Sequence, residues 1–288
     1  MNSTKEQQPK LSVLIRAYNN AGTIVRAIES VLSQKAPFDI QIIVVNDAST
    51  DDTHIKLVPY ISEGIVEYRE QSIRVGAVLN FIEASDMAKG KYTAVLDADD
   101  YYTASLFLWR AVSMLEANRK LIAVYANYEG QAVPKFCSKK DKPALFPEGK
   151  LFEKLLFYGN FIPSCAIVYH TPPPIELSEL FRLERNTIPV VSDYPVNLYL
   201  SRRGEIEYLP SAVYHYTTDQ LTPTVSRPGT KYKEIAYRFG IFRIRCDHIK
   251  MLRPDRISNS FELTACRIFF FCKIASDLVR ETVKIIIK

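Results

Sequence analysis

Three aspartates within four consecutive positions are the strongest candidates for chemistry in this sequence. Asp97, Asp99 and Asp100 come directly after the apolar run at residues 92–96. Carboxylates this close repel one another, and burying them without a cation would be costly. Oxygen ligands select a hard cation such as Mg²⁺ or Mn²⁺, which proteins often share with substrate phosphates. Taken alone, the cluster fits a metal site and a solvated turn of capping aspartates equally well.

The segments that must position these aspartates alternate between strand and helix patterns. Strands are predicted at 11–15, 40–45, 65–68 and 92–96. Helices are predicted at 24–32, after the N-cap candidates at 49–52, and at about 75–88. This alternation is typical of an α/β fold with a doubly wound, mostly parallel sheet and flanking helices, in which ligands bind at the carboxyl ends of the strands. The aspartate cluster and the pair Asn46-Asp47 both follow strands, so we expect them at one sheet edge.

Beyond residue 127 the pattern is less regular. Helices are predicted at 149–157 and 192–202, and short strands at 165–169, 205–209 and 211–216. Residues 129–147 and 217–230 have the composition of loops, and the sequence from about 231 is helical with a break near Arg253-Pro254. We therefore divide the chain into a flexible segment at 1–9, a catalytic domain at 10–229 and a basic helical C-terminal extension at 230–288.

Positive charge is concentrated in the C-terminal part of the chain. Residues 230–288 carry 13 Lys/Arg against 6 Asp/Glu, a net +7, while residues 1–229 carry 24 against 26, a net −2. A basic tail favours an anionic partner such as a membrane surface or an acidic acceptor. Nucleic acid is not expected as a partner, because no nucleic-acid-binding module accompanies the charge.

The cysteines and the polar N-terminus favour a cytoplasmic protein. The five cysteines show no CxxC pair and no regular spacing, so we interpret them as free thiols in a reducing compartment. No signal-peptide pattern opens the sequence, and no apolar stretch is long enough to span a bilayer. The expected location is the cytoplasm, with peripheral contact at the inner face of the membrane as an option.

Four segments together resemble family 2 of the inverting glycosyltransferases, which have the GT-A fold. They are residues 15–19 (Ile-Arg-Ala-Tyr-Asn), 44–53 (Val-Val-Asn-Asp-Ala-Ser-Thr-Asp-Asp-Thr), 90–92 (Gly-Lys-Tyr) and 97–100 (Asp-Ala-Asp-Asp). Each is weak by itself, but their order and spacing are specific. The resemblance covers roughly residues 10–217.

This resemblance implies roles for residues in the donor half of the chain. Tyr18 matches the aromatic residue that stacks on the nucleotide base, with a core tyrosine as the alternative. Asp47 matches the acid that hydrogen-bonds the base, although the acid that usually precedes it is Asn46 here. Arg74 matches a phosphate-contacting arginine, with an exposed residue at a helix start as the alternative. Asp97 would contact the ribose or support the metal, and Asp99 would ligate Mn²⁺ or Mg²⁺.

The acceptor half offers a catalytic base and a less certain histidine. Asp193 matches the family's catalytic aspartate, which would deprotonate the acceptor hydroxyl. Ser192 stands where Glu or Gly usually precedes that aspartate, and Asp193 could instead, or in addition, cap the following helix. Many relatives carry Tyr-Arg-x-His where this sequence has Tyr-His-Tyr-Thr at 214–217. His215 could therefore contact the metal or the diphosphate, or it could be a packed histidine.

The end of the chain has the pattern of a basic amphipathic helix. Apolar residues recur every three or four positions from Phe261 to Ile286, and Lys273, Arg280, Lys284 and Lys288 fall on the opposite side. Such a helix could lie in a membrane interface near a lipid-linked acceptor. Its apolar face could equally pack on the catalytic domain or on a second subunit in a homodimer.

The function expected from these features is metal-dependent, inverting transfer of a sugar. The donor would be a nucleotide-sugar, with UDP the commonest carrier among relatives, and the acceptor a hydroxyl of a glycan or lipid-linked sugar, as in cell-surface polysaccharide synthesis. A non-catalytic nucleotide-sugar-binding or scaffold homologue is the alternative. A sugar nucleotidyltransferase is disfavoured because residues 17–22 lack its Gly-rich basic loop, and no GxGxxG follows a strand as in nicotinamide enzymes.

Overall fold

The computed structural model describes residues 8–129, 150–158, 160–173 and 193–217, with shorter pieces at 176–177 and 180–181 and separate positions between 241 and 283. These residues fall into two compact units. Unit 1 consists of Met1–Cys137, Ile162–Ser178 and Gly204–Thr217, and unit 2 of Ser138–Phe161, Glu179–Arg203 and Thr218–Lys288. The predicted boundary at 229/230 lies outside the described residues.

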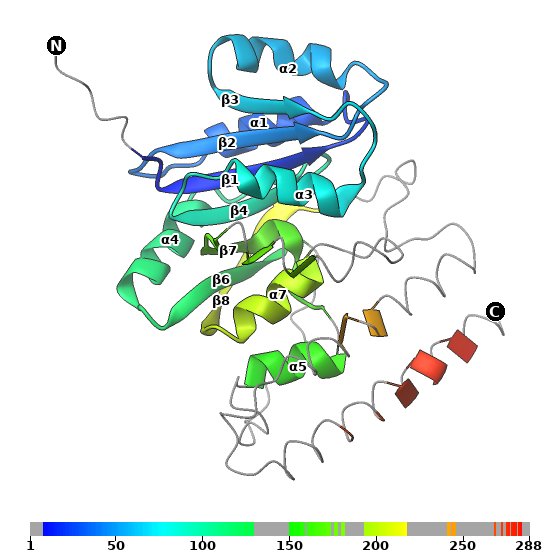
Figure 1. Ribbon diagram of the computed structural model, residues 1–288. Helices are drawn as coiled ribbons and strands as arrows, with labels where there is room; N and C mark the ends of the chain where they lie inside the picture. Colours follow the sequence, from blue (N-terminus) through cyan, green and yellow to red (C-terminus); the bar gives the residue numbers. More distant parts are fainter. Residues whose placement is uncertain are drawn as a thin grey trace. The chain divides into compact units, whose positions relative to one another are not determined.

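Unit 1 is built on an eight-stranded sheet with the order β3-β2-β1-β4-β7-β6-β8-β5 (Figure 1). The strands are β1 (Leu11–Ala17), β2 (Ile40–Asn46), β3 (Val66–Glu70), β4 (Tyr92–Asp97), β5 (Tyr101–Tyr102), β6 (Leu121–Tyr128), β7 (Ile167–His170) and β8 (Glu205–His215). Neighbouring strands from β3 to β4 are parallel, as are β6 and β8, whereas β7 is antiparallel to β4 and β6, and β5 to β8. The prediction of a mostly parallel sheet with flanking helices is confirmed.

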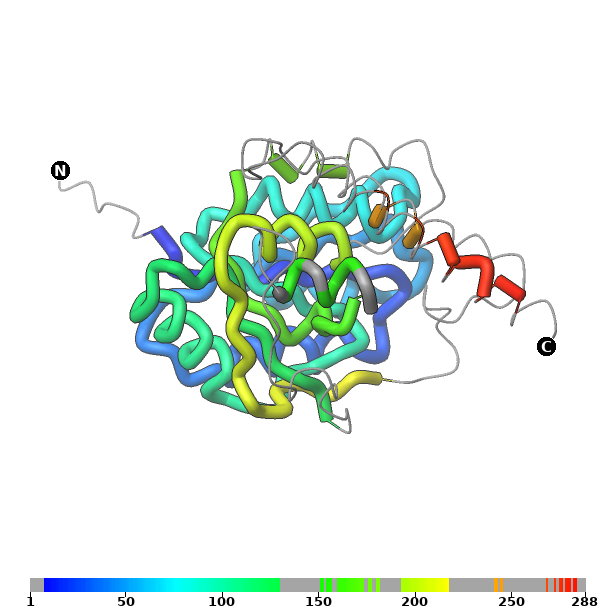
Figure 2. The backbone as a smooth tube through the Cα atoms, turned by 90° about the horizontal axis from the view of Figure 1, so that it is seen from below, coloured from blue at the N-terminus to red at the C-terminus, as the bar shows by residue number. Residues whose placement is uncertain are grey.

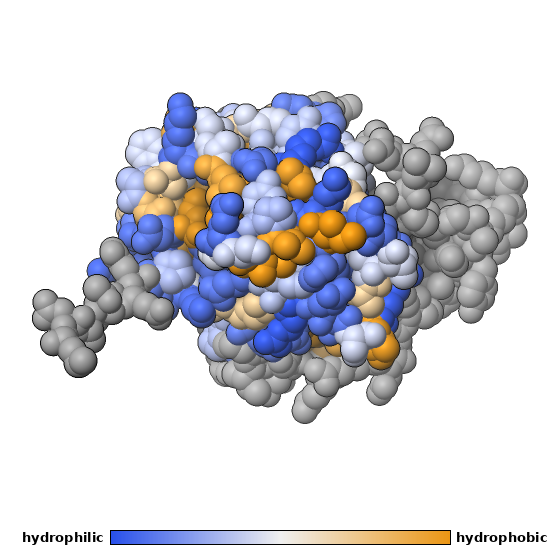
Figure 3. Space-filling view, turned by 90° about the horizontal axis from the view of Figure 1, so that it is seen from above, coloured by the Kyte–Doolittle hydropathy of each residue, from blue (hydrophilic) through white to orange (hydrophobic). Residues whose placement is uncertain are grey.

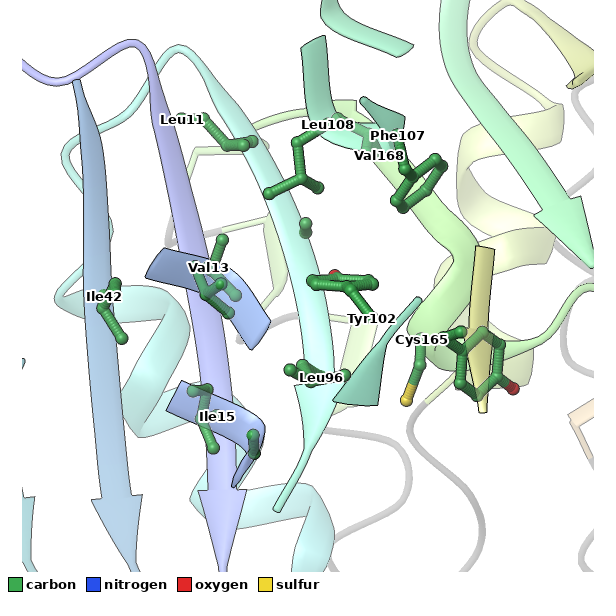
Figure 4. Close-up of a cluster of buried hydrophobic side chains, with 14 of the residues drawn as sticks. Leu11, Val13, Ile15, Ile42, Leu96, Tyr102, Phe107, Leu108, Cys165 and Val168 are labelled. Atoms are coloured by element: carbon green, nitrogen blue, oxygen red, sulfur yellow. The ribbon is translucent and has the colours of Figure 1, made fainter. Parts of the chain in front are cut away.

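Apolar side chains on both faces explain why the central strands form. Leu11, Val13 and Ile15 point to one face of β1 and belong to a buried cluster that also includes residues of α1 (Ile24–Leu32) and α4 (Phe107–Ala117). Figure 4 shows part of this cluster, including Leu96 and Cys165. Leu14, on the other face of β1, is also fully buried, so this strand packs apolar side chains on both of its faces. The helix α3 (Ala77–Asp86) contacts β1 and β2, and Figure 1 shows it in front of the sheet with α1 behind.

The strand β8 differs from the prediction, and β5, β6 and α4 were not predicted. Residues 205–209 and 211–216 were expected as two strands, but β8 continues through Pro210. Its pairing with β6 passes from Tyr125–Tyr208 to Asn127–Ala212, so β8 has two more residues than its partner there. A bulge accommodates proline because the missing N–H is then not needed for the ladder. Figure 2 shows the curved course of β8, in yellow.

The edge helix α2 (Thr53–Ser62) packs beside β3 and carries some exposed apolar residues. Ile55 and Val58 are exposed on its surface. The face seen in Figure 3, on the side of α2, shows separate hydrophobic groups among hydrophilic ones. Singly exposed apolar residues of this kind are normal on soluble domains.

A buried polar network fixes the amino ends of β1 and β4. The Ser12 hydroxyl donates to Gln41 Oε1 at 2.5 Å and accepts from the Gly90 N–H at 2.8 Å. A Cβ atom on Gly90 would lie 2.5 Å from the backbone nitrogen of Ser12. Gly90 is therefore required by the close approach of two backbones and not by its dihedral angles.

Unit 2 contains the helices α5 (Lys150–Tyr158) and α7 (Asp193–Ser201), which pack on each other. Both were predicted within a residue or two. The described positions from 241 to 283 are helical, and Ile268, Val279 and Val283 from the predicted apolar face of the C-terminal helix are exposed. Among the described residues, no helix is long and apolar enough to cross a membrane. The loops expected at 129–147 and 217–230 lie outside the described residues except for their first positions, Glu129 and Thr217.

Candidate active site

The three aspartates form a tight turn where β4 ends. Strand pairing with β1 continues to this point, because the Ala98 N–H donates to the carbonyl of Arg16 at 3.2 Å. The Asp100 N–H then donates to the Asp97 carbonyl at 3.0 Å, which closes the turn. Asp97 and Asp99 are half-buried and Asp100 is 2% exposed. The cluster is therefore not a solvated turn: one of its carboxyl groups is deeply buried.

Arg16 faces Asp97 directly across the two parallel strands. The two residues are register partners of β1 and β4. Arg16 donates to Asp97 Oδ1 through Nε at 3.0 Å and also through a terminal guanidinium nitrogen. The side chains are 13% and 33% exposed, so this ion pair is partly shielded from solvent. Charge-assisted bonds in such a setting fix the direction of the carboxylate.

Asp100 is buried among groups that favour its protonated form. Burial and the neighbouring negative charge of Asp97 raise the pKa of Asp100 to about 8, although a hydrogen bond from the Thr217 N–H at 2.9 Å opposes the shift. The Cys165 thiol lies 3.3 Å from the second carboxyl oxygen. Burial also raises the pKa of Cys165 well above its usual range, so the thiol stays protonated. Burial therefore favours the neutral forms of both groups at the turn.

The donor set of the turn fits a hard divalent cation. Ligand atoms of Asp97, Asp100 and Cys165 all lie within 4.8 Å of one another, and Asp99 belongs to the same turn. A cation would relieve the repulsion that raises the pKa of Asp100. Carboxylate oxygens suit Mg²⁺ or Mn²⁺, whereas a protonated thiol is a poor ligand for either ion.

Tyr18 and Arg74, two of the expected nucleotide-binding residues, lie against each other. The Arg74 guanidinium carbon is 3.9 Å from the centre of the Tyr18 ring, which is a cation–π contact. Tyr18 is half-buried and Arg74 is exposed, so neither is a core residue. The alternative of a core tyrosine does not hold, and the pair offers a flat aromatic surface with a cation beside it.

Asp47 holds the loop that carries Arg74. Its carboxylate is 4% exposed and accepts hydrogen bonds from the N–H groups of Val75 at 2.7 Å and Gly76 at 2.9 Å. Gly76 has a φ of +88°, which a side chain would strain, and α3 begins at the next residue. Asp47 therefore stabilises the N-terminal end of α3 and orders the loop beside Tyr18.

The departure at Asn46 has a local cause. Asn46 is fully buried, and its amide nitrogen donates to the Tyr68 hydroxyl at 3.0 Å and to Glu70 at 3.4 Å. Its carbonyl oxygen accepts from the N–H of Ser49 at 3.2 Å. An aspartate at this position could not donate and would face the carboxylate of Glu70. Asn46 stabilises the turn after β2, and the Asp47 carboxylate binds the loop before α3.

His215 lies in a cluster beside the acidic turn. Its ring stacks on Tyr101 with centroids 5.1 Å apart, and Nδ1 is 3.2 Å from a carboxylate oxygen of Glu129. The guanidinium of Arg26 lies 4.4 Å from the Tyr101 ring centre and donates to the Asp99 carbonyl at 3.2 Å. His215 is thus partnered on one ring nitrogen, and its role as a metal or diphosphate contact stays a prediction.

The candidate base belongs to unit 2 and is described there by itself. Asp193 is the first residue of α7, where its Oδ1 accepts from the Tyr194 N–H at 2.9 Å. Its Oδ2 accepts from the Asn160 amide at 2.6 Å, and Asn160 in turn accepts from Asn197 at 2.9 Å. The carboxylate therefore has both a position at a helix start and a chain of two amides that orients it.

Sequence reasoning missed several residues that contact the candidate site residues. Arg16 lies inside the quoted segment 15–19 and Asn160 outside the quoted segments, and neither was given a role. The register of β1 with β4 is the signal that could have paired Arg16 with Asp97. Thr217 contacts both Asp99 and Asp100, since its hydroxyl donates to the Asp99 carbonyl at 2.5 Å. Nothing in the sequence alone indicates that contact, because 117 positions separate Thr217 from Asp100.

Comparison with known proteins extends these observations. The sequence matches the family described as glycosyl transferase family 2 over residues 12–171. A curated relative is the UDP-Glc:alpha-D-GlcNAc-diphosphoundecaprenol beta-1,3-glucosyltransferase WfaP of Escherichia coli. It is 34% identical over 118 residues, covering 41% of this chain and 45% of the relative. The chain covers 33% and 58% of the lengths of the first curated relatives that it matches.

Two solved structures show the same fold. S. aureus TarS 1-349 in complex with UDP-GlcNAc has a TM-score of 0.64 at 18% identity, over 92% of this chain and 71% of that one. The mannosyltransferase PcManGT from Pyrobaculum calidifontis, in complex with GDP-Man and Mn²⁺, has a TM-score of 0.57 at 16% identity, over 96% and 76%. At such identity these likenesses show the fold alone. Since the family match spans 160 of the 288 residues, the chain is a member of glycosyl transferase family 2 with a GT-A fold.

Proposed function

We propose that this enzyme is a metal-dependent, inverting glycosyltransferase that moves a sugar from a UDP-sugar to a hydroxyl of a glycan or lipid-linked acceptor. The observation that carries the proposal is the shared sheet edge: Tyr18 and Asp47 follow β1 and β2, and the acidic turn follows β4. Ligands of such sheets bind at the carboxyl ends of the strands. The names of WfaP and the TarS complex support UDP as the carrier.

In this proposal the base stacks on Tyr18 and the diphosphate approaches Arg74. A cation–π contact holds Arg74 against the Tyr18 ring. The Asp47 carboxylate orders the same loop by accepting hydrogen bonds from the N–H groups of Val75 and Gly76. Arg74 can contact phosphate oxygens while it keeps its stem against the ring. Asp97 would accept a hydrogen bond from a ribose hydroxyl.

A divalent cation, Mn²⁺ or Mg²⁺, would be held at Asp99, with Asp97 and His215 as further candidates. When bound, it would neutralise charge on the departing diphosphate. The three carboxyl groups within four positions at the turn support this, because carboxylate oxygens are the ligands that these ions prefer. The PcManGT complex with Mn²⁺ is consistent with such a site in a protein of this fold.

Transfer would proceed by single displacement with inversion. The acceptor oxygen attacks the anomeric carbon, the bond from that carbon to the diphosphate oxygen breaks, and Asp193 takes the acceptor's proton. Its two hydrogen bonds, from the Asn160 amide and the Tyr194 N–H, support an ionised and oriented carboxylate. Capping of α7 and proton removal are compatible, since an ionised carboxylate can also accept a capping hydrogen bond.

Two sets of measurements test the proposal. In a thermal-shift screen of nucleotide-sugars with and without Mn²⁺, the melting temperature of the wild type should rise most with one UDP-sugar plus the ion. With that donor and an acceptor panel, Asp193→Asn should lower kcat by about a hundredfold or more while donor binding stays unchanged. Wild-type turnover in Asp193→Asn would refute the assignment of Asp193 as the catalytic base. If the wild type binds a donor but forms no product with any acceptor, the protein is better explained as a non-catalytic homologue.

The wider setting follows from the same proposal. A lipid-linked acceptor, such as the diphosphoundecaprenol substrate in the name of WfaP, would place the enzyme in polysaccharide synthesis at the cytoplasmic face of a membrane. Exposed Ile268, Val279 and Val283 would then contact the lipid interface, with a homodimer as the other way to cover them. Co-sedimentation with anionic liposomes, compared with sedimentation equilibrium without them, separates these two outcomes.

A further inference from the structure

We propose that Arg16 is a positioning residue of the donor site that neutralises Asp97 and so weakens divalent-cation binding at the acidic turn. The cation then binds firmly only together with the diphosphate of the donor. This inference rests on the proposed cation site and goes beyond it, because it assigns the site's low intrinsic affinity to one residue outside the acidic motif.

Strand register and hydrogen bonds hold the Arg16 side chain against Asp97. The two residues are register partners on adjacent parallel strands, so their backbones hold the side chains opposite each other. Two guanidinium N–H groups of Arg16 converge on Asp97 Oδ1. Arg16 is only 13% exposed, and its carbonyl accepts from the N–H of Ala98 within the turn itself. An arginine fixed in this way is part of the turn and not a mobile surface charge.

Charge at the turn gives the pair its effect. Asp100 is 2% exposed and accepts from the Thr217 N–H at 2.9 Å and from the Cys165 thiol at 3.3 Å, so its carboxyl group is engaged inside the protein. Arg16 compensates the charge of Asp97, which removes one negative charge from those that the turn can offer a cation. Fewer negative charges at the ligands weaken the binding of a divalent ion. The α- and β-phosphate oxygens of the donor's diphosphate would supply further negative charge and ligands when the donor binds.

Arg16 also directs Asp97 toward a second role. Because the guanidinium engages Oδ1, the other carboxylate oxygen is fixed in direction. The Cys165 sulfur accepts from the Asp97 N–H at 3.3 Å, which holds the backbone of the same residue. A carboxylate restrained at both ends suits acceptance of a directional hydrogen bond better than adjustment around an ion.

The test is calorimetric titration of Mn²⁺ alone, without nucleotide, into the full chain. Arg16→Gln should bind Mn²⁺ about tenfold more tightly than the wild type, because a positive charge beside the site is removed. Arg16→Lys keeps the charge and should stay within about threefold of the wild type. Arg69→Gln removes an arginine on β3 that pairs with Glu83 of α3, outside the turn, and should leave the affinity unchanged.

A double variant covers the risk that Arg16→Gln misfolds. Arg16→Gln combined with Asp97→Asn replaces the ion pair by a neutral hydrogen-bonded pair, and its Mn²⁺ affinity should match the wild type within about threefold. Equal affinities of Arg16→Gln and wild type, or a loss of more than about tenfold in the double variant, would overturn the role of Arg16. Asp99→Asn separates failure of the proposed role of Arg16 from failure of the proposed cation site. If this variant binds Mn²⁺ as the wild type does, the proposed cation site itself is wrong.

Discussion

Replacing Asp100 by asparagine should make this protein more stable at neutral pH, and the gain should grow as the pH rises. Asp100 is 2% exposed, with a pKa of about 8 in the folded chain against an ordinary value of 3.8. Between these two values the unfolded chain releases the proton and the folded chain keeps it. Folding therefore takes up a proton, and stability falls as the pH rises from about 4 to about 8.

The size of the effect follows from the difference in bound protons. Each pH unit inside this window costs the folded wild type about 1.4 kcal/mol, so about 2–3 kcal/mol separate pH 5 from pH 7. Asparagine keeps both contacts of the protonated acid, because its oxygen can accept from the Thr217 N–H and its amide can donate to the Cys165 sulfur. The variant should lack this pH dependence. Its advantage in unfolding free energy over the wild type should widen by about 2–3 kcal/mol over those two units.

Urea unfolding followed by tryptophan fluorescence measures this directly. Trp109 is the single tryptophan of the sequence and lies on α4, so it reports on unit 1. The measurements are made in EDTA, and Asp39→Asn, at an exposed aspartate, serves as the matched control. If the difference between Asp100→Asn and wild type were constant from pH 5 to pH 7, Asp100 would not be protonated in the folded chain and the charge accounting of the turn would be wrong.

Other substitutions test separate parts of the molecule. Gly90→Ala should cost about 2–3 kcal/mol of unfolding free energy, because its Cβ would meet the Ser12 nitrogen, whereas Gly22→Ala has open space and should be near neutral in the same urea assay. Asp47→Ala should lose about 2 kcal/mol and weaken UDP binding about tenfold or more in calorimetry, since two N–H groups lose their acceptor; unchanged UDP binding would restrict Asp47 to a structural role. Tyr18→Leu should weaken uridine binding by about 1–3 kcal/mol while sparing stability. Equal uridine affinities of this variant and the wild type would place the base elsewhere.

The parallel half of the sheet could be predicted from the sequence because its signals are local. The runs that became β1, β2 and β4 are apolar at nearly every position, as strands buried on both faces must be, and each ends in polar residues. The same regularity located the acidic turn and Asp47. Tyr18 and Arg74 were both expected to contact the nucleotide. Their cation–π contact with each other was not expected, because it depends on the conformation of the loop before α3.

The rest of the site depends on long-range pairing that no local pattern encodes. Pro210 was interpreted as a break between two strands, whereas it lies in a bulge within the single strand β8. Cys165 had no motif, and its contact with Asp100 exists because the residues before β7 return to the end of β4. The buried state of Asp100 also escaped sequence reasoning, since adjacent aspartates look alike until the fold assigns each a different environment.

The sheet order has a consequence for the growing polypeptide. β4 is synthesised with β1 already available as its neighbour, but its other edge pairs with β7, which is made about 70 residues later. During synthesis a nascent chain that ends before β7 presents an open hydrogen-bonding edge, beside which lie the three aspartates of the turn. Before Cys165 and Thr217 are made, they do not yet bury Asp100, so we expect its carboxyl group to be ionised and to repel the same edge of an identical chain. The same carboxyl groups that are proposed to serve the donor would then act earlier as a guard against premature association.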